Sequence, residues 1–131
     1  MNRFDDTILR EESFSMRDLQ GIDRWMAWTV TRTSWTDVGT PTVTASFRDV
    51  GRHCFFQIKV VPGTSIATAA GTSYTNLPIP AKGIGGVATM QDLTANTAVG
   101  NCVIDAANSR VYPPAQTASG HTFTICGWYQ I

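Results

Sequence analysis

The chain has 131 residues, and its ten basic and ten acidic side chains cancel at neutral pH. This length fits one domain plus a short extension, which excludes a multidomain enzyme. A neutral chain has no general attraction to nucleic acid or to an anionic membrane. No apolar run approaches the about 20 residues that a membrane span needs. We therefore expect neither a nucleic-acid nor a membrane partner.

The composition favours strands. Charged residues are only 15% of the chain, and 18 Thr and 8 Ser stand against 2 Lys. Thr fits a pleated surface, and Ser and Gly favour turns, so these residues indicate strands and turns rather than helices.

The segment 1–28 differs from the rest and is predicted to be an arm for attachment or subunit exchange. Residues 1–24 hold ten of the twenty charges. A hydroxyl cap at Ser15 followed by Asp18 predicts one short helix, which Gly21 interrupts. The apolar residues are too few to bury a core alone, so we expect the arm to order against a partner. The arm contacts are predicted to be Phe4, Ile8, Leu9 and Phe14, with Arg3, Arg10 and Arg17.

The segment 29–131 is predicted to be an antiparallel β-sandwich, jelly-roll-like, with about eight short strands. In chain order, residues 28–32 alternate, and residues 42–47 place Val43, Ala45 and Phe47 on one face. A turn at 49–52 precedes a strand over 54–61 with apolar residues on both faces. Residues 62–71 are expected to form a loop. Further strands are expected around 72–76, 86–90, 98–104 and 122–130.

The three cysteines, Cys54, Cys102 and Cys126, are odd in number and widely spaced. Small secreted domains usually carry an even set of disulfide-forming cysteines. We expect buried free thiols and folding in a reducing cytoplasm, with one disulfide as the alternative.

No residue pattern predicts catalysis, a cofactor or a metal site. The two histidines, His53 and His121, lack metal-ligand spacing. His53 and Cys54 are adjacent in a strand, so they should face opposite ways. His121 with Asp105 and Ser109 is a conceivable triad, but no nucleophile-elbow pattern surrounds the serine. The body's four acids occur at strand ends or turns, where Asp caps the backbone. The glycine-rich stretch 83–86 lacks the ending of a phosphate loop.

The aromatic residues are better candidates for function. Trp25, Trp28 and Trp35 lie where arm and body meet, and they are predicted to pack that junction or a neighbour, or alternatively to bind a ligand. Trp128 is expected in the core or at a subunit seam. Phe47, Phe55 and Phe56 are expected to fill the core.

Four short motifs carry a resemblance over about residues 34–131. They are FRDVGRHCFFQI at 47–58, GTSYTNLP at 71–78, SRVYPP at 109–114 and GWY at 127–129. Together they resemble small β-domains of tailed-bacteriophage virion proteins, found at tail-fibre tips and as appendage or head proteins. The resemblance implies a β-sandwich, often trimeric, without catalytic activity. A fibre would have a long shaft, whereas only about 30 residues precede this sandwich.

We therefore expect a non-enzymatic virion structural protein, a head decoration or cement accessory clamped to the assembled particle. The alternative is a tail-fibre or neck-appendage module that binds a host receptor or cell-surface glycan. A small hydrolase is disfavoured by the absence of paired acids. The expected partners are copies of the chain, with a trimer implied, and major capsid or tail and neck proteins. The expected location is the virion, assembled in the host cytoplasm.

Overall fold

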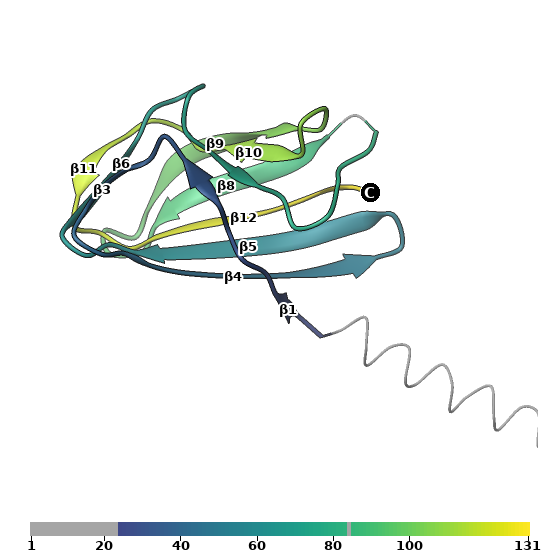
Figure 1. Cartoon of the computed structure of the whole chain (residues 1–131), viewed down its shortest axis with the longest axis horizontal. Helices are drawn as coiled ribbons and strands as arrows, with labels where there is room; N and C mark the ends of the chain where they lie inside the picture. The colour runs from purple at the N-terminus through teal and green to yellow at the C-terminus, as the bar shows by residue number, and fades with distance from the viewer. Residues whose placement is uncertain (1–23, 84) are drawn as a thin grey trace, which may run out of the picture.

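The structure is a computed structural model that describes residues 24–83 and 85–131, and this part of the chain is all-β (Figure 1). Its strands pair antiparallel in two sheets, which confirms the predicted antiparallel, sandwich-like fold. The larger sheet has the order β1 (Met26–Ala27), β4 (Thr42–Val50), β5 (His53–Val61), β12 (Phe123–Gln130), β8 (Gly86–Asp92), β9 (Thr97–Asp105), β10 (Arg110–Tyr112), β7 (Tyr74–Asn76) and β2 (Arg32–Thr33). The smaller sheet has the order β11 (Gln116–Ser119), β6 (Ser65–Thr68) and β3 (Thr36–Val38).

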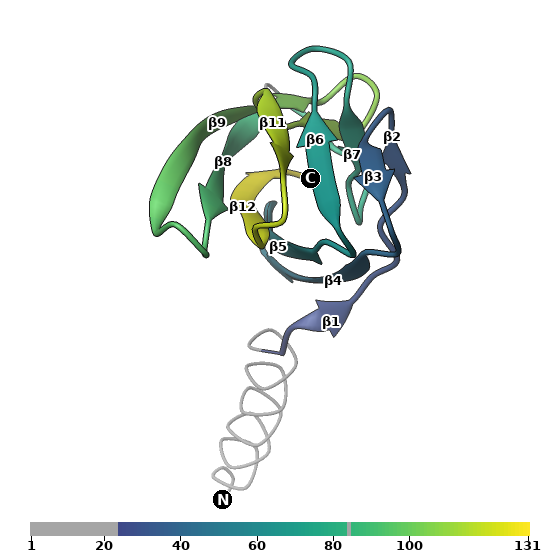
Figure 2. The same ribbon diagram turned by 90° about the vertical axis from the view of Figure 1, so that its left-hand side faces the viewer.

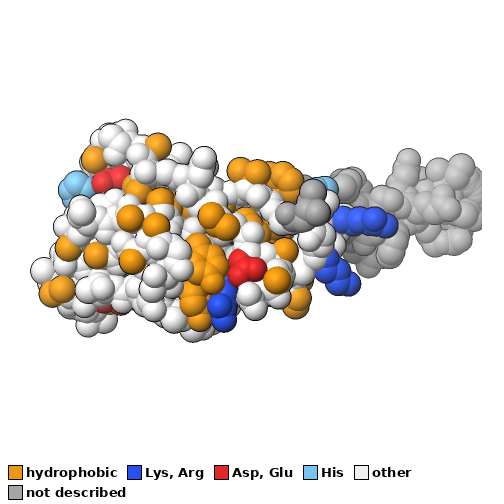
Figure 3. Space-filling model, turned by 90° about the horizontal axis from the view of Figure 1, so that it is seen from above, with side chains coloured by type: hydrophobic (Ala, Val, Ile, Leu, Met, Phe, Trp, Pro, Cys, Tyr) orange, Lys and Arg blue, Asp and Glu red, His pale blue; other side chains and the backbone are white. Residues whose placement is uncertain are grey.

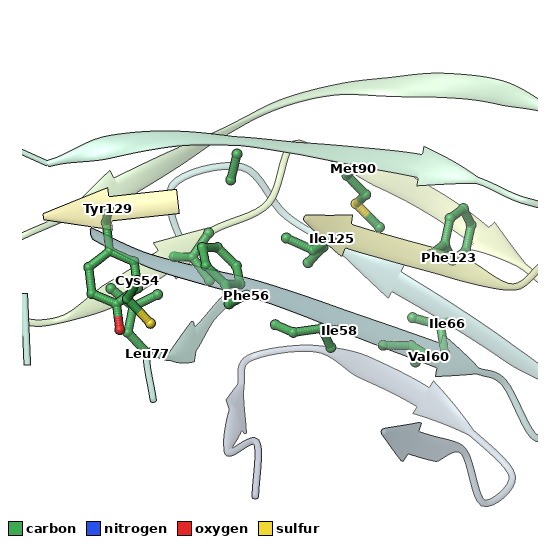
Figure 4. Close-up of a cluster of buried hydrophobic side chains, with 12 residues drawn as sticks. Cys54, Phe56, Ile58, Val60, Ile66, Leu77, Met90, Phe123, Ile125 and Tyr129 are labelled. Atoms are coloured by element: carbon green, nitrogen blue, oxygen red, sulfur yellow. The ribbon is translucent and has the colours of Figure 1, made fainter. Parts of the chain in front are cut away.

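The larger sheet curls around the core, and the smaller sheet faces it across the interior (Figure 2). Burial alternates strictly from residue to residue along β5, and this alternation shows which face of the sheet points into the core. Its even-numbered residues from Cys54 to Val60 are buried, whereas the odd-numbered ones are exposed, as period-two geometry requires. Ile66 of β6 is fully buried against this inner face. Figure 4 shows the cluster, which comprises Cys54, Phe56, Ile58, Val60, Ile66, Leu77, Ala88, Met90, Val111, Phe123, Ile125 and Tyr129.

Strand β12 is the centre of the large sheet. It pairs along its whole length with β5 and over seven residues with β8. Its inward positions are Phe123, Ile125, Gly127 and Tyr129. At Gly127 an added Cβ would meet the Val87 carbonyl oxygen and the Ala88 side chain, so only glycine fits this close approach.

Several strand predictions need correction. The loop predicted over 62–71 contains the strand β6. Its small and polar residues Ser, Ala and Thr are typical of loops, but Ile66 is buried in the core and holds the strand there. The strand predicted over 28–32 is replaced by β1 and β2 on either side. Residues 24–83 and 85–131 form twelve strands where about eight were predicted, because short strands such as β3, β10 and β11 are set by pairing partners rather than by local pattern.

Two predictions of burial are wrong for a reason of register. Phe55 and Cys126 are exposed on the outer face, because each alternates with a buried neighbour. Trp128 also faces outward and is not in the core, and its alternative place at a subunit seam stays a prediction. Phe47, in contrast, packs against the core, and Phe56 lies in it.

The predicted arm contacts Phe4, Ile8, Leu9 and Phe14, the arm arginines and the predicted short helix lie outside the described residues. Residues 26–28, which the sequence placed in the arm, contact the body. Met26 pairs with Phe47, and Trp28 packs edge-on against Phe47 and Phe56.

The Tyr129 hydroxyl fastens the segment before β8 to the core. It donates to the Ile79 carbonyl oxygen at 2.8 Å and accepts from the Ile79 amide at 3.0 Å. Tyr129 is fully buried, and burial raises the pKa of its hydroxyl well above the ordinary value. The hydroxyl therefore stays protonated and able to donate.

Tyr129→Phe should lower the free energy of unfolding by about 1–3 kcal/mol, because both Ile79 backbone groups lose their partner. Urea unfolding followed by tryptophan fluorescence measures this loss. Tyr74→Phe is the control, since it removes a hydroxyl from an only half-buried ring. An unchanged midpoint for Tyr129→Phe would show that water replaces the bonds.

Gly127→Ala should lower the free energy of unfolding by about 1–3 kcal/mol, because the new methyl group overpacks the β12–β8 contact. Thermal unfolding by circular dichroism tests this expectation. The matched control is Cys126→Ala, one residue away on the outer face, which should change stability by less than about 0.5 kcal/mol. Equal effects of the two substitutions would contradict the close approach.

Candidate functional site

A row of exposed apolar side chains crosses the outer face of the large sheet. Phe55 pairs in register with Trp128, and Trp128 pairs with Val87. Val103 follows Cys102, the partner of Ala88, so it lies beside Val87 on the next strand. The exposed fractions are 38% for Phe55, 36% for Trp128, 55% for Val87 and 64% for Val103. We call these four residues the outer stripe.

The outer stripe continues to the point where the described chain begins. Arg48 of β4 pairs in register with Phe55, and its guanidinium carbon lies 5.8 Å from the ring centroid of Trp25. Trp25 itself is 40% exposed. At the same end of the sheet, the His53 ring meets the Trp128 ring edge-on, with centroids 5.2 Å apart. Arg48 therefore lies between the N-terminal junction at Trp25 and the apolar row on the four neighbouring strands.

A shallow hollow of about 330 Å³ adjoins the outer stripe. The next outward row along the strands is Ser46, Gln57 and Cys126, all smaller or more polar than the stripe residues. The Gln57 amide nitrogen donates to the Ser46 hydroxyl at 2.9 Å. Lys59 lies at the hollow as well. The outer stripe, the hollow and the Lys59 ammonium group together form a surface that is complementary to an apolar segment with acidic side chains.

A second concave feature, the side groove, has a volume of about 690 Å³ and lies along β9 and β10. Tyr112, Pro113 and Pro114 line it together with Asn101 and Asp105, and it borders the outer stripe at Val103. Next to it, the Arg110 guanidinium lies 4.1 Å from the Tyr74 ring centroid and donates to the Tyr112 hydroxyl at 3.4 Å. The groove is thus mainly apolar, with an aromatic ring and a few polar groups.

Asp105 in the groove is committed to its own turn. Its carboxylate accepts hydrogen bonds from the Asn108 side chain and backbone. These bonds, with the Asn108 side chain first, lower the pKa of Asp105. An acid held ionised and already bonded is a structural cap more than a general acid.

The conceivable triad of His121, Asp105 and Ser109 is not formed. The His121 Nδ1 instead lies 2.7 Å from the buried carboxylate of Asp92. Ser109 accepts a hydrogen bond from the Ala81 amide. Asp92 also accepts from the Thr94 and Ala95 amides, so the pair closes the β8–β9 turn onto the start of β12.

The cysteines are free, as predicted, and desolvation raises the pKa of all three thiols, that of Cys102 to about 12 and that of exposed Cys126 through partial desolvation on the sheet surface. A nucleophilic thiol needs the opposite shift. Cys54 is buried while neighbouring His53 is exposed, which confirms that the two side chains face opposite ways.

The three predicted interface tryptophans do not share one site. Trp25 contacts Arg48, and Trp28 packs on the core with its indole nitrogen buried and without a hydrogen-bond partner among the described residues. Trp35 lies 5.3 Å from the guanidinium of Arg32, which in turn binds Asp37 through two hydrogen bonds. Of the three, only Trp25 borders the outer stripe.

The sequence reasoning missed the outer stripe. The strand over 54–61 indicated such a surface, because apolar residues occupy both of its faces. Only one face can point into the core, so the apolar residues on the other face must be exposed or covered by something else. Which of the later residues continue the row depends on pairing between distant strands. Figure 3 shows the molecule from above the view of Figure 1, where hydrophobic side chains gather in clusters and charged side chains are few.

Comparison of the chain with models of protein families, with curated proteins and with solved structures finds no match. The likeness to phage virion domains therefore stays a prediction. Within residues 24–83 and 85–131, no cluster of His, Cys, Asp and Glu is arranged to hold a metal ion. In the same described part, no helix has the length and apolarity to cross a membrane.

Asp92→Asn should lower the melting temperature at pH 7, because the amide cannot accept from His121 and two backbone amides as the carboxylate does. The hydrogen bond with His121 contributes most to lowering the pKa of Asp92 from its ordinary 3.8. The stabilisation is therefore present above pH 3.8 and is lost as the pH falls through the lower folded-state pKa. Melting curves between pH 7 and pH 2 should show wild type and variant converging at the acid end. A constant difference would contradict this account.

Proposed function

We propose that this chain is a non-enzymatic structural protein of a tailed-phage virion, a head decoration or cement accessory that clamps onto the assembled particle. The outer stripe is the observation that carries the proposal. A contiguous exposed apolar row is unusual on a soluble protein and marks an interaction surface. The motif resemblance supports the virion as its setting.

The outer stripe suits docking onto a preformed lattice. Its residues stand on four hydrogen-bonded strands, so little conformational entropy is lost when they are buried. Phe55 and Trp128 are adjacent aromatic anchors of the kind that dominate binding energy. Many copies on a symmetric particle add avidity to a modest single contact. The N-terminal segment, which joins the body beside the stripe, is placed to extend that contact to a neighbouring subunit.

The alternative is a tail-fibre or neck-appendage module that binds a host receptor or cell-surface glycan. The side groove favours it, because Tyr112 offers an aromatic ring next to the amide of Asn101 and the carboxylate of Asp105. Aromatic rings with a few hydrogen-bonding groups suit a sugar ring.

Binding of the full chain to phage particles that lack it, and to bacterial host cells, separates the two functions. The wild type should bind particles and not cells. Phe55→Glu combined with Val87→Glu should weaken particle binding by at least about tenfold, since two charges would enter an apolar contact. Thr117→Glu, at an exposed position of β11 in the other sheet, is the matched control and should bind normally.

Particle binding that survives the double substitution would overturn the outer stripe as the docking surface. Binding to cells and not to particles would overturn the decoration role in favour of the appendage. Thermal unfolding of each variant confirms that the fold is intact.

A further inference from the structure

We infer that, in the free protein, the chain's own residues 1–23 cover the outer stripe and the adjoining hollow. The inference concerns the protein alone and does not depend on a virion partner. Charge, chain direction and length each support it.

The first argument is charge. Residues 1–23 contain three basic and six acidic side chains, a net charge of −3. The remaining residues contain seven basic and four acidic side chains, a net charge of +3. On this face, the outward positions of β4, β5, β12 and β8 carry Arg48 and Lys59 and no carboxylate, and β9 adds one carboxylate, Asp105, which is already hydrogen-bonded to Asn108. The segment and this face are therefore electrostatically complementary.

The second argument is chain direction. Met26 pairs with Phe47 and Ala27 with Ser46, antiparallel to β4. Toward lower residue numbers the chain therefore runs along β4 toward the β4–β5 turn, the end of the sheet where the outer stripe lies. Trp25 is already beside Arg48, the register partner of Phe55. Gly21 is a residue at which the chain can reverse onto the outer face without steric cost.

The third argument is length and content. The four strands of the outer stripe span about 15 Å across the sheet, because the three intervals between them measure about 4.8 Å each. Twenty-three residues reach about 35 Å as a helix and about 75 Å when extended. The segment supplies apolar side chains for the row and the hollow, among them Phe4, Ile8, Leu9 and Phe14. Because it is tethered at Trp25, its effective concentration at the stripe is of millimolar order, which favours its own stripe over that of another copy.

Cys126 provides a reporter within the full chain. It is exposed in the described body and lines the hollow, so a covering segment would shield its thiol. Maleimide labelling of each cysteine, followed by peptide mass spectrometry, measures the shielding. Fully buried Cys54 serves as the internal reference for intact folding.

The test compares the wild type with a full-length variant in which Phe4, Ile8, Leu9 and Phe14 are replaced by Ser. The labelling rate of Cys126 should rise by about tenfold, the change expected if about nine-tenths of molecules are covered. Val87→Glu, which disturbs the stripe from the other side, should raise the rate as well. The matched control, Asn2→Ala with Thr7→Ala, changes the segment without removing apolar groups and should leave the rate unchanged.

Equal rates in the wild type and the four-serine variant would overturn the inference. A wild-type rate that falls as the protein concentration increases about a hundredfold would also overturn it, because the occupant would then be a second copy. A rate independent of concentration, with the increase in both apolar variants, supports it. No phage particle enters this experiment, so its failure is separate from a failure of the proposed function.

Discussion

The fold depends on the pairing of the last strand, β12, into the middle of the large sheet. β5 and β8 are neighbours of β12 on its two sides and are not paired with each other, so the sheet is two separate pieces until β12 lies between them. The hydrophobic core also depends on β12, because this strand contributes Phe123, Ile125 and Tyr129 to the cluster that contains the buried residues of β5 and β6. Such long-range pairing is slow to form, because the loop-closure entropy is lost before the contacts are made. Gly127 allows the close approach of β12 and β8, and the Tyr129 hydroxyl ties the segment before β8 to the core.

The same pairing creates the outer stripe. In every strand beside β12 the inward positions are taken by the core, so alternate residues must face outward. Ordinary outward residues of this sheet are Thr, Ser or Gln, but one row instead carries Phe55, Trp128 and Val87. The strands are held in register by the core, so the row is rigid and pre-formed. A surface of this kind either stays covered or associates with something else. If both proposals hold, the N-terminal segment covers this surface in the free protein and a particle would have to displace it.

The polar groups of the body are used mainly to fasten turns. The Arg32–Asp37 pair closes β2 onto β3, the Asp92–His121 pair closes the β8–β9 turn onto β12, and Asp105 caps the turn before β10. Each is explained by the backbone that it holds. The concave side groove differs. Among the described residues, the side chains of Tyr112 and Asn101 line the groove and do not fasten a turn. The side groove is the feature on which the appendage alternative rests.

The sequence by itself predicted the all-β class, the inward face of the strand over 42–47, free cysteines with one disulfide as the alternative, and the opposed directions of His53 and Cys54. These follow from composition and from period-two alternation, which are local properties of the chain. Only the tertiary structure decided that Phe55 and Trp128 are exposed, that β6 is a strand, that His121 meets Asp92 and that four distant residues form one row. An alternating strand has two possible inward faces when both carry apolar residues, and the choice is made by pairing with strands far away in the sequence. For the same reason short segments such as β6 and β11 are strands only because a partner supplies their hydrogen bonds.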